Sequence, residues 1–441
     1  MRRSPGFSVP RVLLVLSAIS VLPIAEPSPS TALAGEASVL GGARVLDAEG
    51  AGWLEGHAVL VVDGRIEQVA PATEIQAPEG ATHKDLSGLY LLPGLIDLHS
   101  HLLLHPYDET PWDDQVLRES LELRTVRGVA AARATLAAGF TTLRDLGTEG
   151  AAFADVALRD AIEQGIIAGP RVLASTRAIV AVASYGPSGF DPRWMLPKGA
   201  QEANGVAGVR RAVREQVAAG ADWIKVYADY RRRRGAPSTP TFSQDELNAL
   251  VDESHAAGLP VAAHAGTDEG IRRAVLAGVD TIEHGSGASL EVLELMAERG
   301  VVLCPTLAAS EAIARYGGWE PGSPEPERVR SSREMFRRAL RSSVTIATGS
   351  DVGVFAHGDN AREIELMVDY GMSPADALRA TTSTAAEVLG REKDLGRVAA
   401  GFVADLIAVR EDPLLDPAAL RRPALVMKDG EIFPTPKDAT D

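Results

Sequence analysis

The middle of the chain alternates between short apolar runs and segments whose apolar positions follow a helical spacing. Glycines end several of the helical segments just ahead of the next apolar run. Such an alternation over about 300 residues predicts the α/β class, as a (β/α)8 TIM barrel rather than a doubly wound sheet. The predicted strands are 90–98, 140–146, 171–175, 223–227, 260–264, 279–283, 301–305 and 344–348, and the clearest helices are 128–138, 205–219, 243–257 and 289–300.

Both ends of the chain contain short strand patterns separated by turn signals instead of helices. Near the N-terminus these are 37–46, 57–62 and 65–69, and near the C-terminus they are 404–409, 423–427 and 431–433. Strand-rich ends on either side of a barrel predict a small composite β-sandwich domain built from both termini. The expected boundaries are 35–90 and 391–441 for this domain and 91–390 for the barrel.

The first 34 residues have the pattern of a secretory signal peptide. Arg2 and Arg3 precede an apolar run at 12–24, and Ala32-Leu33-Ala34 then forms an A-x-A cleavage signature. The apolar run is short for a membrane span of about 20 residues. The sequence therefore predicts cleavage after residue 34, a periplasmic or secreted protein, and no membrane association after cleavage.

The amino-acid composition indicates which partners and which kinds of site are expected. The 441 residues carry a formal charge of -16, which disfavours nucleic acid and anionic membranes as main partners and favours a small-molecule substrate. Cys304 is the single cysteine, so an intrachain disulfide and a cysteine-rich metal site are excluded. The nine histidines are few enough for their positions to be informative.

Metal-binding residue types gather where the predicted strands end. Two of them, His99 and His101, are two residues apart on one strand, so their imidazoles share a face. One histidine at a strand end is more often structural than a ligand, but several on adjacent strands predict a site for zinc or a similar divalent ion. The ligand types are His99, His101, His264, His284 and Asp351, and Lys225 lies among them on its own strand. A charged ammonium beside a metal is unfavourable, so Lys225 must be neutral, modified or turned away.

At these residues the chain resembles the amidohydrolase superfamily, in its imidazolonepropionase-like and Xaa-Pro dipeptidase (prolidase)-like branch, which includes ochratoxin-degrading amidohydrolases. The run PGLIDLHSH at 93–101 matches the first-strand motif, and GFVADL at 401–406 matches the return into the β domain. The resemblance implies two divalent metal ions, with zinc expected. His99, His101 and Asp351 would hold the more buried ion, and His264 and His284 the more exposed one. Lys225, carboxylated by CO2, would bridge them.

The resemblance also implies the reaction. We expect an exported binuclear amidohydrolase that cleaves the amide bond of small carboxylate-bearing substrates by metal-bound hydroxide, with Asp351 as the proton acceptor. Dipeptides such as Xaa-Pro, N-acyl amino acids and ochratoxin A are the candidate substrates. A lactone, cyclic-amide or carbamate hydrolase on the same scaffold is an alternative, and an inert barrel acting as a binding protein is another. Relatives often form homo-oligomers, so the same is expected of this chain by analogy.

Substrate contacts are expected in the loops after the strands. An arginine run at 231–234 lies on the predicted active-site side and is either a solvated charge run or a source of one carboxylate-binding guanidinium. His105 and His357 are either polar loop residues or groups that orient the tetrahedral oxyanion. The candidate substrate-binding residues are His105, Tyr107, Arg177, Tyr185, Tyr227, Arg231 and His357.

Overall fold

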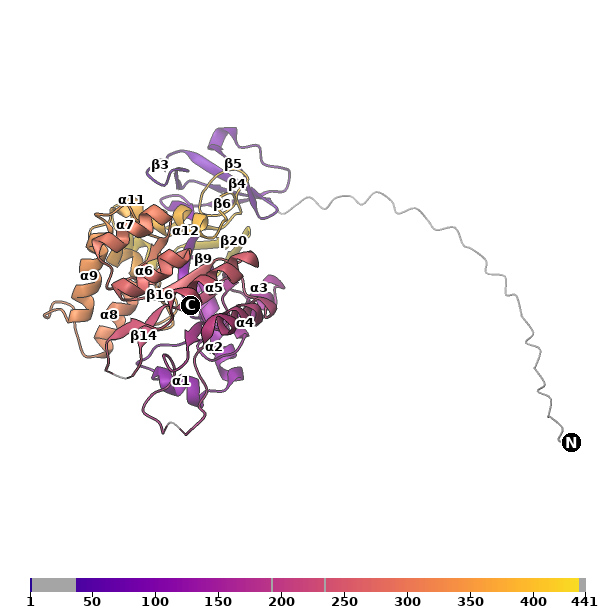
Figure 1. The fold of residues 1–441 in the computed structure, drawn as a ribbon. Helices are drawn as coiled ribbons and strands as arrows, with labels where there is room; N and C mark the ends of the chain where they lie inside the picture. Colours follow the sequence, from indigo (N-terminus) through magenta and orange to yellow (C-terminus); the bar gives the residue numbers. More distant parts are fainter. Residues whose placement is uncertain (2–36, 192, 234, 436–441) are drawn as a thin grey trace. The chain divides into compact units, whose positions relative to one another are not determined.

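A computed structural model describes residue 1 and residues 37–191, 193–233 and 235–435 (Figure 1). The predicted signal peptide, apart from Met1, and residues 436–441 of the predicted C-terminal strand region lie outside these ranges. None of the helices within the described ranges has the length and apolar character needed to cross a bilayer.

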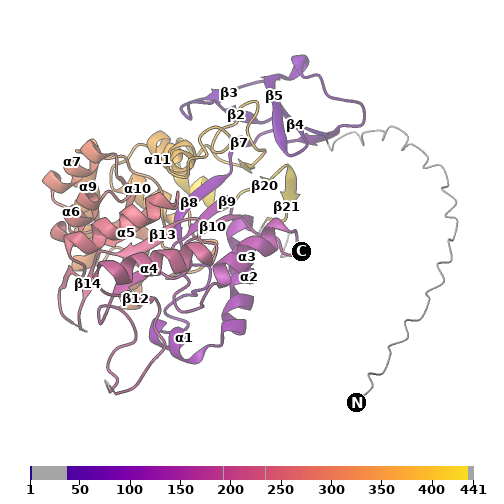
Figure 2. The same ribbon diagram turned by 45° about the vertical axis from the view of Figure 1, so that its right-hand side comes forward.

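Parallel strands surrounded by helices form the predicted barrel (Figure 2). One sheet has the order β10-β9-β8, and a second has the order β12-β11-β13-β16-β17-β18. Their pairings are parallel throughout, which requires a helical or loop crossover between successive strands. The barrel strands are β8 (Leu95–Ser100), β9 (Phe140–Asp145), β10 (Arg171–Ala174), β13 (Ile224–Tyr227), β16 (Val261–Ala265), β17 (Thr281–His284) and β18 (Val302–Cys304).

The predicted eighth strand, 344–348, closes the barrel without forming a regular strand. It makes one parallel bridge, between Ile346 and Leu303. On its other side, the Leu98 N–H donates to the Thr348 carbonyl at 2.9 Å. The Thr348 N–H donates instead to the Ala380 carbonyl, so this donor is lost to the ladder and the pairing stays short.

The third strand is split, which the sequence did not predict. β10 ends at Ala174, and Thr176 adopts a left-handed conformation with φ of 60° before β11 (Ile179–Ala181) begins. A non-glycine residue gives no sequence signal for such a turn. Three further short strands were also missed: β12 (Gln201–Ala203), β14 (Asp229–Arg231) and β15 (Ser238–Pro240).

Helices cover the outside of the barrel and agree with the clearest predictions. α4 (Gly205–Ala218), α5 (Gln244–Ala256) and α7 (Leu290–Arg299) lie where expected, and Ser243 forms a capping box with Glu246. α2 (Leu121–Ala137) begins earlier than predicted, because the Ser120 hydroxyl caps its first turn. The other helices are α1 (Trp112–Arg118), α3 (Ala154–Glu163), α6 (Asp268–Ala277), α8 (Leu307–Tyr316), α9 (Glu327–Ala339), α10 (Arg362–Asp369), α11 (Pro374–Ala380) and α12 (Ser383–Val388).

Strands from both ends of the chain build a separate β-sheet domain, as predicted. One sheet has the order β5-β4-β1-β6, and the other, β21-β20-β19-β7-β2-β3, joins N-terminal to C-terminal strands. Apolar residues of both sheets share one core, including Leu40, Val59, Leu91 and Leu406. The strands are β1 (Ala37–Gly41), β2 (Arg44–Leu46), β3 (Trp53–Leu54), β4 (His57–Val62), β5 (Arg65–Pro71), β6 (Thr82–Asp85), β7 (Tyr90–Pro93), β19 (Leu406–Val409), β20 (Leu425–Lys428) and β21 (Glu431–Phe433).

The predicted strand 90–98 is divided between this domain and the barrel. β7 pairs with β19, whereas β8 pairs with β9. Gly94 separates them where the backbone approaches Thr141 so closely that a Cβ atom would lie 2.3 Å from its hydroxyl oxygen. Glycine is therefore required at this passage between the two sheets.

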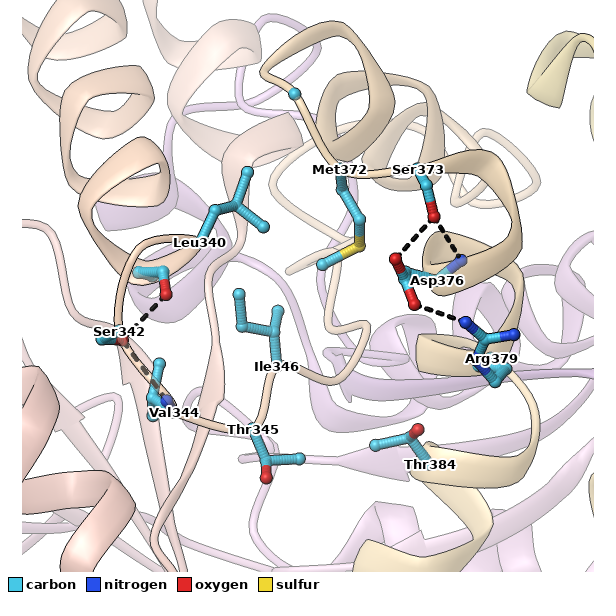
Figure 3. Close-up of a pocket in the computed structure, with 12 residues that line it drawn as sticks. Leu340, Ser342, Val344, Thr345, Ile346, Met372, Ser373, Asp376, Arg379 and Thr384 are labelled. Atoms are coloured by element: carbon cyan, nitrogen blue, oxygen red, sulfur yellow. Dashed lines mark hydrogen bonds and ion pairs between the residues drawn. The ribbon is translucent and has the colours of Figure 1, made fainter.

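A cavity of about 520 Å³ lies beside the segment that leads into 344–348 (Figure 3). Leu340, Ile346 and Met372 give it an apolar wall, and Asp376 bonds Ser373 and Arg379 on the opposite wall. Residues 344–346 begin this strand position and Asp351 follows its other end, so the cavity adjoins the end at which the strand position begins.

A partly buried ion pair joins the barrel to the β domain. The Arg171 guanidinium of β10 donates to the Asp405 carboxylate at 2.6 Å and also contacts Asp429. Replacing Arg171 by Met should lower the free energy of unfolding by about 2–4 kcal/mol, because Asp405 would stay buried without its cation. Urea denaturation measures this loss. Arg211→Met, which removes an exposed pair with Glu215, should cost less than about 0.5 kcal/mol; equal losses in the two variants would contradict the argument.

Candidate metal centre

Two histidines and an aspartate converge at the end of β8. The Nε2 atom of His101 lies 3.2 Å from an Asp351 carboxylate oxygen, and that of His99 lies 3.6 Å from the same oxygen. The three side chains can each offer one ligand atom, and these atoms lie within 4.8 Å of one another. All three residues are buried, as a structural or catalytic metal site requires.

The Asp97 carboxylate brings the two halves of this cluster together. It accepts hydrogen bonds from the His99 N–H on its own strand and from the Ser350 N–H and the Asn360 amide on the segment that carries Asp351. The Asp351 N–H in turn donates to the His99 carbonyl at 2.7 Å. β8 and residues 350–360 are thus fixed in one register.

The other ring nitrogen of each histidine is bound by the protein. His99 Nδ1 lies 2.7 Å from a Glu283 carboxylate oxygen, and His101 Nδ1 lies 2.9 Å from the Gly147 carbonyl. An acceptor at Nδ1 holds the proton there and leaves the Nε2 lone pair free for a metal. Both histidines are therefore oriented as ligands.

Glu283 is held by a buried cation. The Arg144 guanidinium donates to the second Glu283 oxygen at 2.9 Å and stacks on the Trp223 ring at 4.3 Å. Both Arg144 and Glu283 are completely buried. The His99 ring is thus supported by an ion pair inside the barrel.

The two later histidines lie beside this cluster. The His284 ring centroid is 5.1 Å from that of His99 and 4.5 Å from that of His264. His284 Nδ1 is bonded to the Thr306 hydroxyl at 2.7 Å, so its Nε2 atom is also free. His284, Thr306 and Asp351 all have left-handed backbones, a strained conformation that is concentrated at functional sites.

The amine of Lys225, on β13, ends in the same space, 5.7 Å from the Tyr227 ring centroid. Its Nζ atom is buried and has no hydrogen-bond partner among the described residues. Burial lowers the pKa of Lys225 to about 8. A buried amine with no partner fits modification or a bound group better than an ordinary structural lysine.

Electrostatics favours neutral imidazoles at most of these positions. Burial, followed by the Lys225 charge, lowers the pKa of His264 to about 3 and that of His99 well below its usual value. Burial and the neighbouring His264 and His99 do the same to the pKa of His284. Burial also acts to lower the pKa of His101, but the Asp351 hydrogen bond and nearby carboxylates raise it overall to about 9. His99, His264 and His284 are therefore neutral at pH 7 and each has a free nitrogen lone pair. His101 binds a proton near Asp351, and a metal ion at this position would replace that proton.

Aromatic side chains line one side of the cluster. Tyr227 stacks on the His264 ring with centroids 4.5 Å apart, and Tyr230 lies 5.6 Å from the same ring. Tyr185 contacts both tyrosines. Burial, and then the charges of Glu149 and Asp351, raise the pKa of Tyr107 well above its usual value, which places this phenol near the same carboxylates.

The two arginines among the substrate-binding candidates differ in their contacts. The Arg231 guanidinium lies 5.1 Å from the Tyr230 ring centroid and has no hydrogen bond or ion pair within the described residues. The Arg177 guanidinium instead contacts Gln201 and the Phe153 ring, away from the histidines. Arg234 lies outside the described residues.

His105 and His357 have both ring nitrogens engaged by the protein. His105 bonds Glu109 and Glu119, and His357 lies near the Leu104 carbonyl and the Thr135 hydroxyl. Burial lowers the pKa of His357 to about 4. These contacts give both histidines a role in holding the loop after β8 and favour the polar-loop interpretation over oxyanion binding.

Several residues around the site were missed by sequence reasoning. Glu283 adjoins His284 on its strand, and Arg144 occupies the corresponding inward position on β9. A charged residue inside an apolar strand is the signal that could have identified both. Glu149 and Thr306 lie in loops and carry no such signal.

Comparison with known proteins identifies the family. The family model described as "Amidohydrolase family" matches residues 90–433. The chain belongs to the amidohydrolase family. An ochratoxinase of Aspergillus niger is 32% identical over 381 residues, covering 78% of this chain and 76% of that protein. An imidazolonepropionase of Chromobacterium violaceum is 27% identical over 378 residues, covering 81% and 86%.

A solved structure agrees with the observed fold. A Xaa-Pro dipeptidase with bound methionine in the active site is 30% identical, with a TM-score of 0.80 over 90% of this amidohydrolase and 100% of that chain. Together with the His99, His101 and Asp351 cluster, the family identifies a metal-dependent amidohydrolase that acts on C–N bonds. The inert binding protein considered from sequence is therefore excluded.

Glu283→Gln should weaken metal binding about 10- to 100-fold, because the amide cannot both accept from His99 and pair with Arg144. Competition with a chromophoric chelator measures the affinity. Glu291→Gln, at an exposed carboxylate of α7, is the control and should bind metal as the wild type does. Unchanged affinity in Glu283→Gln would show that the His99 orientation does not depend on this ion pair.

Proposed function

We propose that this amidohydrolase hydrolyses the amide bond of small substrates that carry a carboxylate, such as dipeptides and N-acyl amino acids. The supporting observation is the unpaired Arg231 guanidinium, which lies one aromatic ring away from His264. Its charge acts on His264, whose pKa it helps to lower, behind the larger effects of burial and Lys225. An arginine without a partner in so acidic a protein favours an anionic substrate group.

We also propose a binuclear centre, with zinc as the expected metal. His99, His101 and Asp351 would hold one ion, His264 and His284 the other, and Lys225, carboxylated by CO2, would lie between them. Two bound divalent ions supply Lewis acidity and an activated water near neutral pH. The unpartnered Lys225 amine supports this role, because carboxylation would remove its unfavourable buried charge.

The chain's own residues would complete the reaction. Asp351 is the carboxylate that can take a proton at the oxygen that the two histidines do not contact, and return it to the leaving nitrogen. This transfer is needed because an amide nitrogen leaves poorly unless it is protonated. The bond from the Asp351 N–H to the His99 carbonyl keeps Asp351 in place.

Ochratoxin A remains a candidate substrate, because its cleaved bond is an amide of an amino acid and a relative is named ochratoxinase. A homo-oligomer is proposed by analogy with relatives.

The substrate proposal predicts a preference for acids over carboxamides. Metal-loaded enzyme should cleave an N-acyl amino acid with kcat/KM about 10- to 100-fold above that of the matching C-terminal carboxamide, the gain expected of charge-assisted hydrogen bonds. Arg231→Met should remove the preference through KM, measured on a panel of dipeptides, N-acyl amino acids and lactones.

Two control variants accompany the panel. Arg330→Met removes an exposed arginine of α9 and should keep the preference, whereas Asp351→Asn should lose turnover on every amide. Activity on lactones alone would contradict the proposed substrate class.

We further propose export with removal of residues 1–34. N-terminal sequencing of the protein recovered from periplasm or medium should begin at Gly35. Recovery of the chain with its first 34 residues intact would contradict processing.

A further inference from the structure

Glu149 is a buried carboxylate beside the metal centre that the reaction above does not use. It follows β9, is only 2% exposed, and has a left-handed backbone with φ of 49°. The Arg124 guanidinium holds this conformation by donating to the Glu149 carbonyl at 2.7 Å. A strained, buried glutamate indicates a position selected for its carboxylate rather than for packing.

The Glu149 carboxylate lies between ligands of the two proposed metal positions. A Cβ atom placed on Gly147 would lie 3.6 Å from a Glu149 oxygen and 3.8 Å from the His101 ring. On the other side, the Tyr227 hydroxyl contacts the same oxygen at 3.3 Å while its ring stacks on His264. The carboxylate is therefore at the edge of the reaction space.

The donors around Glu149 are neutral. The Tyr185 hydroxyl donates at 2.5 Å and the Trp112 indole N–H at 2.9 Å, both to the same oxygen. No lysine, arginine or histidine side chain among the described residues forms an ion pair with Glu149. Glu283, by contrast, is paired with Arg144. A buried carboxylate without a paired cation is costly and favours a cationic ligand.

The hydroxyl groups of Tyr185 and Tyr227 also favour a cationic ligand. Each has one proton, and both protons are directed to Glu149, which leaves oxygen lone pairs as the groups that Tyr185 and Tyr227 can offer a ligand. This surface accepts hydrogen bonds and has no proton left for a carboxylate.

We propose that Glu149, with the phenol oxygens of Tyr185 and Tyr227, binds the free ammonium group of an aminoacyl substrate. The inference rests on the proposed amide hydrolysis and narrows its substrate class to dipeptides with a free N-terminus. The ammonium would face Glu149 while the carboxylate faces Arg231, so the two charged ends fix the direction in which the scissile amide enters. N-acyl amino acids, which lack the ammonium, are then poorer substrates.

The test compares two compounds that differ only in this group, L-Ala-L-Pro and N-propionyl-L-Pro. Wild-type enzyme loaded with metal should favour the dipeptide about 10- to 100-fold in kcat/KM, as expected of charge-assisted hydrogen bonds. Glu149→Gln should reduce this ratio to near one by raising KM for the dipeptide. Glu122→Gln, at an exposed glutamate of α2, is the matched control and should keep the wild-type ratio.

Other outcomes would overturn the inference. A wild-type ratio near one, or a Glu149→Gln variant that loses activity equally on both compounds, would show that Glu149 only positions the tyrosines. If Glu149→Gln does not fold, Glu149→Asp, which keeps the charge, and Tyr185→Phe, which removes one phenol oxygen, should each lower the ratio without abolishing it. No change in either would contradict the ammonium site.

Failure of the proposed function would be distinguishable. If the loaded wild type cleaves neither compound nor any other amide of the panel, the hydrolysis proposal fails. L-Ala-L-Pro and N-propionyl-L-Pro then serve as ligands that are bound but not cleaved. Calorimetry should still give a dissociation constant about 10-fold or more lower for the dipeptide. Equal affinities would reject the ammonium site as well.

Discussion

The Asp97 carboxylate ties the first barrel strand to the segment that carries Asp351. Its oxygens accept from the His99 and Ser350 backbones and from the Asn360 amide, with the Ser350 hydroxyl as a further donor. The backbone adds only isolated bonds to this register, among them the Ser100–Val352 bridge and the bond from the Asp351 N–H to the His99 carbonyl. Without Asp97, the separation between the histidines of β8 and Asp351 would rest on these few backbone bonds alone. Glu283 orients His99, Gly147 orients His101 and Thr306 orients His284. These three histidines can converge with Asp351 only while that separation is kept.

The site combines a buried, neutral set of imidazoles with a few uncompensated charges around it. His99, His264 and His284 have lowered pKa values, and Lys225 Nζ has no hydrogen-bond partner within the described residues. Around these groups, the Arg231 guanidinium and the Glu149 carboxylate form no ion pair with any residue that the structure describes. Burial makes the Glu149 charge costly for the free protein, and a zwitterionic substrate would satisfy both. In a chain with a net charge of -16, this local arrangement matters more for binding than the overall charge.

Much of the fold and the proposed ligand set could be predicted from sequence, because both follow from short-range patterns. Strand ends mark the open face of a barrel, and His99, His101, His264, His284, Lys225 and Asp351 all stand at such ends. The partners of these residues could not be predicted. Arg144 meets Glu283 only across the barrel interior, 139 residues apart in sequence. The break after β10 depends on the left-handed backbone of Thr176. The direction in which the Tyr185 hydroxyl donates depends on the position of Glu149, which the sequence does not reveal.

We propose that the converging side chains hold a pair of divalent ions with Lys225 between them. Anomalous diffraction from a crystal of the zinc-loaded protein tests it most directly. We expect two zinc peaks, one bounded by His99, His101 and Asp351 and one by His264 and His284, with density for a carboxylated Lys225 between them. A single peak, or peaks at residues outside this set with an unmodified Lys225, would contradict it.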